Sequence, residues 1–461
     1  MKTKKINYVY KTEPYDHQKD VLEVSWAARY WALFLEMGTG KSKIICDTIG
    51  MLYERKEINA ALILAPKGVF DNWVKGEIPT HLPDRIERNV LRWTPSKTKA
   101  FQEKLRAITY EDSEDLKIFV MNIEAFSSAR GTKAAQTFLN SNPDNIVVVD
   151  ESTTIKNRKA ARTKNIVDLE ELSKYRRILT GSPVTKSPMD LFSQCLFLSP
   201  RALGFNSFFA FQGRYAMVQR RTMGHRSFQE IVGYRRLDEL NEKLLTFSSR
   251  ILKEDCLDLP PRIYVRREVE LTDEQAKLYT QMKRLALAQL NNGELATTSS
   301  VLTQIMRLQQ ICCGFLQPDE GPIEPLPNNR LSGLMSAIDE TQGKVIIWAS
   351  YTYDIQRITS ALRDRFGPEA VATYYGATPQ DERQDIIEKF QDVNSELRFF
   401  VGQPKTGGFG ITLHAASTMI YFSNSYDLEI RLQSESRAHR INQTKSVTYI
   451  DLVSPNTIDE K

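Results

Sequence analysis

The alternation of short apolar runs with segments of helical periodicity constrains the fold of this chain most strongly. The runs are rich in β-branched and aromatic residues and form two series, at residues 30–35, 60–65, 117–121, 146–149 and 177–180, and at residues 344–349, 371–375, 398–401, 419–422 and 447–452. Such an alternation is typical of βα units, which build parallel sheets. The pattern therefore predicts an α/β fold with two parallel-sheet lobes.

The region between the two series differs from both of them. From about residue 199 to 330 the β pattern fades, and amphipathic segments at 273–290 and 301–311 indicate a mainly helical insertion. Pro260 and Pro261 mark a break, because proline cannot continue a helix. We expect an N-terminal lobe of residues 1–256 that includes part of the insertion, and a C-terminal lobe of residues 257–461 with a helical insertion at about 271–330.

The composition limits the class of protein. The 461 residues are 41% hydrophobic and 26% charged, as in a soluble globular protein, and a formal charge of +5 is too small to indicate nucleic-acid binding by itself. No apolar run approaches the ~18 residues of a membrane helix, and the N-terminus lacks the apolar region of a signal peptide, so we expect an intracellular protein without a membrane partner. The five cysteines include no Cys-x-x-Cys pair, which disfavours zinc and disulfides and predicts buried free thiols.

The segment EMGTGKS, at residues 36–42, follows an expected strand and precedes an expected helix. This context suits a phosphate-binding loop, in which glycines allow backbone N–H groups to approach the phosphates and the helix N-terminus stabilises the anion. The full pattern has a glycine where this chain has Leu35. The motif predicts ATP and Mg²⁺ as cofactors, with Lys41 on the β and γ phosphates, Ser42 on the metal, and a nucleotide-binding set of Gly38, Thr39, Gly40, Lys41 and Ser42.

Two carboxylates follow the apolar run at 146–149. Asp150 and Glu151 would stand at the C-terminal end of a buried strand, where sites lie in open α/β sheets. We expect Asp150 to hold magnesium and Glu151 to orient and deprotonate the attacking water. A pair of capping residues at a helix start is the alternative interpretation.

Two arginines near the C-terminus complete the predicted catalytic set. Arg437 and Arg440 are three residues apart, so on a helix they share one face and point together into a cleft. Guanidinium groups in such a cleft stabilise charge on the transferred γ phosphate. A solvated basic helix face is the alternative.

Eight motifs in order resemble those of superfamily-two helicase-like ATPases of the Swi/Snf family. They are PYDHQ (14–18), EMGTGKS (36–42), LILAPKGVFDNW (62–73), DESTTIKN (150–157), LTGSP (179–183), KVIIWASY (344–351), TGGFGITLHAA (406–416) and QSESRAHRINQT (433–444). The resemblance runs from about Tyr15 to Lys461, and chance rarely supplies eight such motifs in sequence. It is closest to compact members of phage and bacterial type.

The resemblance implies two RecA-like lobes with ATP in the cleft between them. It assigns adenine recognition to Gln18 and lines the second lobe's side of the cleft with Gly408, Gly410 and Gln433. Residues of LTGSP (Thr180, Gly181 and Ser182) would relay the nucleotide state to the DNA path. Ser152 and Thr153 stand where the family usually has Ala-His, which puts the coupling contact of that histidine in doubt.

Family members grip duplex DNA mainly through its phosphates. By motif position, the resemblance makes Lys67, Ser350 and Thr406 candidate DNA contacts. A hairpin or loop expected around Gly224 carries further basic residues, and we hypothesise that it touches DNA at a branch point: Arg220, Arg221, His225 and Arg226. An ordinary exposed turn is the alternative. The aromatic group at 205–215 suits base stacking in principle, but its helical spacing favours core packing.

These expectations combine into one predicted function with two alternatives. The chain is expected to be an ATP-dependent translocase on double-stranded DNA that remodels branched DNA by branch migration or fork regression, in replication, recombination or repair. Displacement of bound proteins is a second task for the same motor. The alternatives are a strand-separating DNA or RNA helicase, and an ATP-gated DNA-binding scaffold with little turnover.

Overall fold

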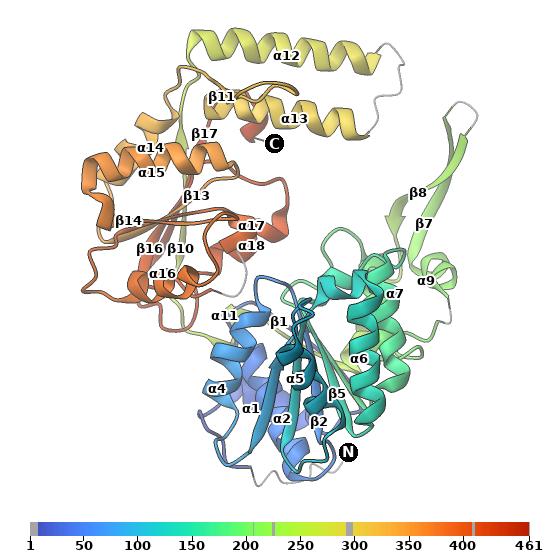
Figure 1. Ribbon diagram of the computed structural model, residues 1–461. Helices are drawn as coiled ribbons and strands as arrows, with labels where there is room; N and C mark the ends of the chain where they lie inside the picture. The colour runs from blue at the N-terminus through green and yellow to red at the C-terminus, as the bar shows by residue number, and fades with distance from the viewer. Residues whose placement is uncertain (1–7, 206, 224–225, 292–297, 408–410, 461) are drawn as a thin grey trace. The chain divides into compact units, whose positions relative to one another are not determined.

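The computed structural model describes residues 8–205, 207–223, 226–291, 298–407 and 411–460. The chain divides into two compact units, Met1–Leu257 and Asp258–Lys461, each built on its own parallel sheet (Figure 1). This arrangement confirms the predicted α/β class with two parallel-sheet lobes. The boundary lies within a few residues of Pro260 and Pro261, where the chain cannot continue a helix.

The first unit contains a seven-stranded sheet in which every neighbouring pair is parallel. Its strands, in spatial order, are β3 (Arg88–Arg92), β4 (Leu116–Asn122), β2 (Ala60–Ala65), β5 (Asn145–Asp150), β6 (Tyr175–Leu179), β1 (Tyr30–Leu35) and β9 (Ser248–Ile251). The central strands β2 and β5 are buried along their whole length, which explains their uninterrupted apolar sequences.

Helices cover both faces of this sheet. One face packs on α1 (Asp16–Ser25), α2 (Lys41–Glu54), and the continuous segment of α3 (Phe70–Asn72), η1 (Trp73–Glu77) and α4 (Ile78–His81). The other face packs on α5 (Lys99–Tyr110), α6 (Ala129–Ser141), α7 (Ala161–Val167) and α8 (Leu191–Leu198). Shorter helices follow at α9 (Phe208–Tyr215), α10 (Leu237–Leu245) and α11 (Lys253–Cys256).

The second unit contains a six-stranded parallel sheet. Its strands are β10 (Arg262–Glu268), β17 (Val447–Val453), β16 (Ala416–Tyr421), β13 (Lys344–Trp348), β15 (Phe399–Gly402) and β14 (Val371–Tyr374), in spatial order. The helices of this unit include α14 (Arg330–Asp339), α15 (Thr352–Phe366), α16 (Glu382–Gln391), α17 (Pro404–Gly407) and α18 (Leu428–Glu435). A helical pair, α12 (Asp273–Asn291) and α13 (Thr298–Cys313), follows β10 in the chain, and after it come the short strands β11 (Phe315–Leu316) and β12 (Glu324–Pro325), which pair antiparallel with each other.

The region between the two series is less uniformly helical than the sequence predicts. It contains a two-stranded antiparallel hairpin, β7 (Ala216–Met223) and β8 (Arg226–Tyr234), and the strands β9 and β10, which complete the two sheets at their edges. The strand β3 was also missed. Edge strands such as β10 (RIYVRRE) carry charged residues because they are not buried on both sides, so they lack the apolar run that marks a central strand.

The five cysteines, all within the described residues, are free thiols. Four of them are buried, as predicted, whereas Cys256 in α11 is only partly buried. Burial raises the pKa of Cys195 and Cys313, so these thiols stay protonated and act as small apolar groups in the core.

Candidate active site

The loop between β1 and α2 has the backbone conformation of an anion-binding turn. Gly38 and Gly40 have φ of 83° and 90°, and Gly40 caps the 14-residue helix α2, which begins at Lys41. The first N–H groups of an α-helix have no partner within the helix, so the start of α2 offers donors and a positive dipole end to an anion. A Cβ at Gly40 would lie 2.1 Å from Gln18 Nε2, so only glycine fits here.

Gln18 holds this loop from the neighbouring helix α1. Its side chain is buried, its Nε2 donates to Thr39 O at 3.0 Å, and its Oε1 accepts from Tyr15 N–H at 3.1 Å. The Nε2 of His17 lies 2.9 Å from the same Thr39 oxygen, so the tautomer with its proton on Nε2 also donates to it. Gln18 therefore contacts the predicted phosphate loop directly, and its role toward adenine stays a prediction.

Lys41 and Ser42 stand in the first turn of α2. The Lys41 ammonium donates to Leu35 O at 2.9 Å and to Glu36 O at 3.4 Å, which places the cation over the loop. The half-buried Ser42 follows it at the start of the same helix. The structure thus brings an ammonium, a hydroxyl and the N-terminus of a helix to one place, which is the chemistry that phosphates and magnesium require.

The predicted carboxylates lie where β5 ends. Asp150 is the last residue of the strand and is buried, and its Oδ1 accepts the backbone N–H of Glu151 at 2.9 Å. Glu151 has a left-handed φ of 47°, an unfavourable conformation for a residue with a side chain. Strained backbone of this kind is commonly found at functional positions.

Sequence reasoning missed a partner of Asp150. The indole N–H of Trp73, a fully buried side chain, donates to Asp150 Oδ2 at 2.9 Å. Trp73 is the last residue of the motif LILAPKGVFDNW, which is mostly apolar. Nothing in this sequence therefore indicates that its indole N–H has a polar partner.

A hydrogen-bonded chain links the turn after β5 to the LTGSP segment. The Ser152 hydroxyl bonds Gln194 Oε1 at 2.7 Å, and Gln194 Nε2 donates to Pro183 O at 2.9 Å. Gln194 is fully buried in α8, whose sequence LFSQCLFL is otherwise mostly apolar. A buried amide in an apolar helix is the one signal by which the sequence could have identified this link.

The LTGSP segment also contacts the phosphate loop. Thr180 N–H donates to Leu33 O at 3.1 Å, and a Cβ at Gly181 would lie 3.3 Å from Met37 N. Arg250 from β9 donates to Phe34 O and Gly181 O at 2.9 Å each, and burial lowers the pKa of its guanidinium. The loop, the carboxylate turn and LTGSP therefore form one connected set within the first unit.

The two C-terminal arginines converge, although not on a helix as predicted. The helix α18 ends at Glu435, and Arg437 and Arg440 lie in the turns that follow it. Both guanidinium groups donate to Ile411 O at 3.3 Å, and Arg440 also donates to Thr412 Oγ1 at 2.6 Å. The turns thus bring the two guanidinium groups to the same carbonyl oxygen, whereas the prediction relied on helical spacing.

Three further residues of the second unit were predicted to line the nucleotide site: Gln433, Gly408 and Gly410. Gln433 is buried in α18, where its Nε2 lies 3.4 Å from Glu429 Oε1, and its backbone oxygen accepts Arg437 Nε at 2.9 Å. Gly408 and Gly410 lie outside the described residues. Burial and the charge of Arg440 lower the pKa of His414.

Ser350 and Thr406, predicted to contact DNA, are joined through one glutamine. Gln403 Nε2 donates to Ser350 O at 3.0 Å, and the Thr406 hydroxyl donates to Gln403 Oε1 at 3.3 Å. They follow the neighbouring parallel strands β13 and β15, whose carboxyl ends lie at the same edge of the sheet. In the first unit, Lys67 is exposed just after β2.

The predicted basic turn belongs to the β7–β8 hairpin, which projects from the first unit (Figure 1). Arg220 and Arg221 are exposed on β7, where Arg220 donates to Ser227 Oγ at 3.0 Å and Arg221 pairs with Glu230. Arg226 begins β8, and His225 lies outside the described residues.

The aromatic group beside the hairpin packs mainly in the core, as its spacing favours. Phe211 and Tyr215 are fully buried, and Phe205 and Phe208 pack against the same cluster. Phe209 differs, because 68% of its surface is exposed and Arg158 lies 5.3 Å from its ring centre.

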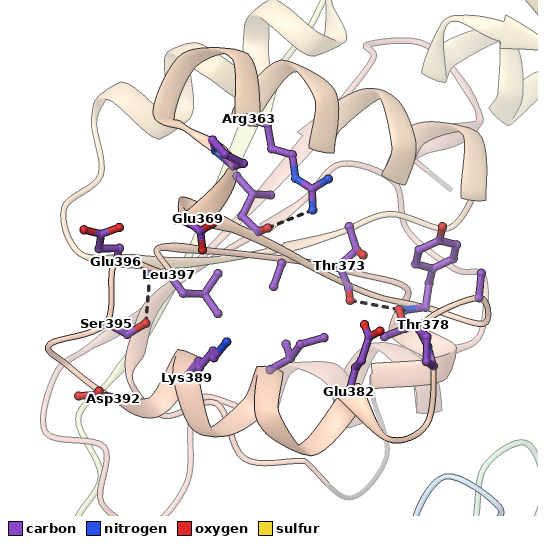
Figure 2. A pocket seen from close by; sticks show the side chains of 17 residues that line it. Arg363, Glu369, Thr373, Thr378, Glu382, Lys389, Asp392, Ser395, Glu396 and Leu397 are labelled. Atoms are coloured by element: carbon purple, nitrogen blue, oxygen red, sulfur yellow. Dashed lines mark hydrogen bonds between the residues drawn. The ribbon is translucent and has the colours of Figure 1, made fainter.

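A cavity of about 780 Å³ lies in the second unit, away from these motifs (Figure 2). It is bounded by α15, α16 and the outer edge of β14, with Arg363 and Lys389 among several carboxylates. Arg363 donates to Val371 O at 3.4 Å and Thr378 donates to Thr373 O at 3.1 Å, so side chains occupy the outward carbonyls of this edge strand. None of the predicted nucleotide or DNA residues is among those that line the cavity.

In the part of the chain that the structure describes, no helix is both long and apolar enough to cross a bilayer.

Two family models match the chain. The model described as "SNF2-related domain" matches residues 17–315, and the model described as "Helicase conserved C-terminal domain" matches residues 329–442. The first match alone covers more than half of the 461 residues.

Curated relatives from yeast and bacteria align with nearly the whole chain. The "SWI/SNF chromatin-remodeling complex subunit snf22" of Schizosaccharomyces pombe is 26% identical over 92% of this chain and 25% of its own length. The "Uncharacterized ATP-dependent helicase MG018" of Mycoplasma genitalium is 26% identical over 92% and 38%, and the "Putative ATP-dependent helicase/translocase YwqA" of Bacillus subtilis is 25% identical over 94% and 46%. The chain therefore spans less than half the length of these relatives.

Among solved structures, the Sulfolobus solfataricus SWI2/SNF2 ATPase core in complex with dsDNA aligns over 100% of this chain and 92% of its own, with 23% identity and a TM-score of 0.45.

Proposed function

Because the chain belongs to the SNF2 family of helicase-type ATPases, we propose that it is an ATP-driven translocase on double-stranded DNA that remodels branched DNA. The observation that carries this proposal is the connected set in the first unit. There, a phosphate-type loop, two carboxylates and the LTGSP segment are joined by hydrogen bonds, so a change at the nucleotide has a physical route to another part of the lobe.

The residues of the first unit suit ATP and magnesium. The left-handed glycines and the start of α2 accommodate phosphate, and Lys41 supplies a cation. Asp150 and Ser42 are the residues that would hold magnesium, which when bound neutralises phosphate charge. The Asp150 oxygens accept from the Trp73 indole and from the Glu151 N–H, and a carboxylate oxygen can accept at more than one lone pair.

Glu151 is the group proposed to act on water. An ionised carboxylate held next to the nucleotide accepts the proton of the attacking water as the new bond to phosphorus forms. Its left-handed backbone fixes where the side chain leaves the chain. From the second unit, Arg437 and Arg440 would stabilise the charge on the transferred phosphoryl group.

The Ser152–Gln194 bond offers a replacement for the histidine that the family usually has in this segment. Through it, the turn that carries Glu151 is tied to Pro183, and so to the LTGSP segment. We infer that this link relays the nucleotide state in the present chain. Ser152 and Gln194 would then make the coupling contact for which the family usually uses a histidine.

DNA would be held mainly through its phosphates. Lys67 in the first unit and the Ser350–Gln403–Thr406 group in the second are the proposed contacts, and Arg220, Arg221 and Arg226 of the hairpin are the proposed contacts at a branch. The name of the Bacillus subtilis relative, "Putative ATP-dependent helicase/translocase YwqA", supports a motor, while the remodelling of branches is our own extension.

Steady-state ATP hydrolysis tests the proposal. Turnover is measured without DNA, and with single strands, linear duplex and a mobile four-way junction. Duplex or junction should stimulate turnover, and Glu151→Gln should lower it by about 10²- to 10⁴-fold because an amide accepts no proton. Glu103→Gln, on the exposed surface of α5, is the matched control.

The pattern of stimulation separates the candidates. Preference for the junction supports branch remodelling, whereas equal stimulation by linear duplex supports a motor without that task. Stimulation only by single strands or RNA identifies a strand-separating helicase. Turnover that no nucleic acid stimulates leaves an ATP-gated scaffold.

A further inference from the structure

The bond between Trp73 and Asp150 joins two motifs that are 77 residues apart in sequence. The indole N–H donates to Asp150 Oδ2 at 2.9 Å, while the other oxygen accepts the N–H of Glu151 at the same distance. Two donors on opposite oxygens fix the rotation of a carboxylate. Because Trp73 is fully buried, water does not compete for this bond.

The backbone that begins at Trp73 departs from α-helical geometry. Residues Trp73–Glu77 form a π-helical turn, in which Ile78 N–H reaches back to Trp73 O. The cause lies in Pro79, which has no N–H to donate and so cannot continue the normal bonding pattern. Single π-helical turns inside α-helices are frequent at functional sites.

The same segment is anchored along its length. Asn72 Nδ2 donates to Glu77 Oε1 at 2.9 Å, and Asp71 pairs with Arg92 of β3. The segment begins at Lys67, a proposed DNA contact, and ends beyond the tryptophan that touches the proposed metal ligand. Only a short stretch of chain therefore lies between Lys67, a proposed DNA contact, and Trp73, which bonds Asp150.

We propose that Trp73 is a positioning residue for magnesium, which holds the Asp150 carboxylate in one orientation and connects that orientation to the segment of residues 67–77. The inference rests on the proposed role of Asp150 as a metal ligand. Residues that orient metal ligands typically change metal affinity or activity by about 10- to 100-fold when they are replaced.

The test measures nucleotide binding rather than turnover. A fluorescent non-hydrolysable ATP analogue is titrated at increasing magnesium concentration and again in EDTA. Trp73→Phe keeps an aromatic ring and removes the donor, so the magnesium concentration at half-saturation should rise about tenfold while the affinity in EDTA is unchanged. Trp31→Phe is the matched control, because it removes a tryptophan hydrogen bond to Ser249 Oγ at 3.0 Å elsewhere in the lobe.

A second variant covers the case in which Trp73→Phe fails to fold. Site-specific incorporation of benzothienylalanine at position 73 preserves the shape of the indole and replaces its N–H by sulfur. The same rise in half-saturating magnesium is expected. A value equal to that of the wild type in this variant overturns the proposal, because only the hydrogen bond has been changed.

Asp150→Asn distinguishes failure of this inference from failure of the proposed function. If Asp150→Asn leaves the magnesium dependence unchanged, then the assignment of Asp150 as a metal ligand is wrong and the inference falls with it. If Asp150→Asn shifts the dependence and the Trp73 variants do not, the inference alone is overturned. If Trp73 acts through Asp150, the double variant should behave as Asp150→Asn does by itself.

Discussion

Among the residues of the phosphate loop, Gly40 leaves little freedom for substitution. Its φ of 90° is strained for any residue with a side chain, and a Cβ would lie 2.1 Å from Gln18 Nε2. Gly40→Ala must therefore move either the phosphate loop or the glutamine that holds it. We expect the affinity for an ATP analogue, measured by fluorescence titration, to fall at least about tenfold, beyond the ~1–2 kcal/mol that the backbone strain costs in stability.

Gly204→Ala separates these two effects. Gly204 also has a positive φ, of 74°, but the nearest atom to an added Cβ is Lys243 Nζ at 3.9 Å. This control should lose stability and keep its nucleotide affinity. If both variants lose affinity equally, strain rather than the contact with Gln18 governs the loop.

The buried carboxyl of Asp354 in α15 predicts a pH dependence of stability. Burial raises its pKa from 3.8 to about 6, although Arg357 at 2.9 Å opposes the shift. The folded state therefore binds the proton more tightly than the unfolded state, so this stabilisation is largest below about pH 4 and is lost as the pH rises through 6. Asp354→Asn cannot lose a proton and lacks that decline.

The difference in unfolding free energy between Asp354→Asn and the wild type should thus rise by up to about 3 kcal/mol from pH 4 to pH 7. Urea unfolding at each pH measures it. Asp339→Asn, at an exposed carboxylate paired with Arg365, provides the control and should show no such rise. A flat difference curve for Asp354→Asn would contradict the raised pKa.

Candidate site residues could be predicted from the sequence where they belong to short motifs. Residues whose proposed role depends on a partner far away in the sequence were missed. Lys41, Asp150 and Glu151 could be placed because loop–helix and strand–turn patterns are local. Trp73 and Gln194 could not, because their hydrogen bonds reach partners 77 and 42 residues away in the sequence. For Arg437 and Arg440 the expected helix is wrong, since both lie in the turns that follow α18.

At the scale of elements, the β7–β8 hairpin carries the most specific prediction about DNA. Arg220 and Arg221 are exposed on a ribbon that projects from the first unit. If both contact phosphates, replacing both by alanine should lower the slope of log affinity against log salt by about 2, since each contact contributes roughly 0.9. Fluorescence anisotropy on linear duplex and on a four-way junction measures this, and the junction should be affected more.

Two controls accompany this experiment. Turnover without DNA should stay unchanged in the double variant, because the hairpin holds none of the nucleotide-site residues. Lys99→Ala with Lys104→Ala removes two exposed charges from α5 and should leave the salt slope unchanged. An unchanged slope in the hairpin variant would make it an ordinary exposed turn.

The burial of a strand determined whether it could be predicted from the sequence. The central strands of both sheets have apolar runs because both of their faces are covered, and these runs identified them. The strands β3, β9 and β10 escaped prediction because they are short or polar and stand at sheet edges. The β7–β8 ribbon was expected as a hairpin or a loop, and its strands could not be delimited because they are largely exposed and carry no core-facing alternation.

For the whole molecule, the proposed chemistry is divided between the two compact units. The groups proposed to bind the nucleotide and to act on water belong to the first unit, and the two arginines belong to the second. The proposed roles thus assign binding to one unit and stabilisation of the transferred phosphoryl group to the other. Substitutions in the two units should therefore affect different kinetic constants.

Arg440→Ala tests this division. Because the first unit would still bind ATP, we expect KM to change little while kcat falls by about 10³-fold or more, the usual contribution of an arginine to phosphoryl transfer. Arg440→Lys should recover little activity, since an ammonium lacks the planar fork with which a guanidinium matches phosphate oxygens. Arg365→Ala, at an exposed ion pair of the same unit, should retain normal turnover. A rise in KM with unchanged kcat would instead place Arg440 in nucleotide binding, and the two units would then share binding rather than divide the steps.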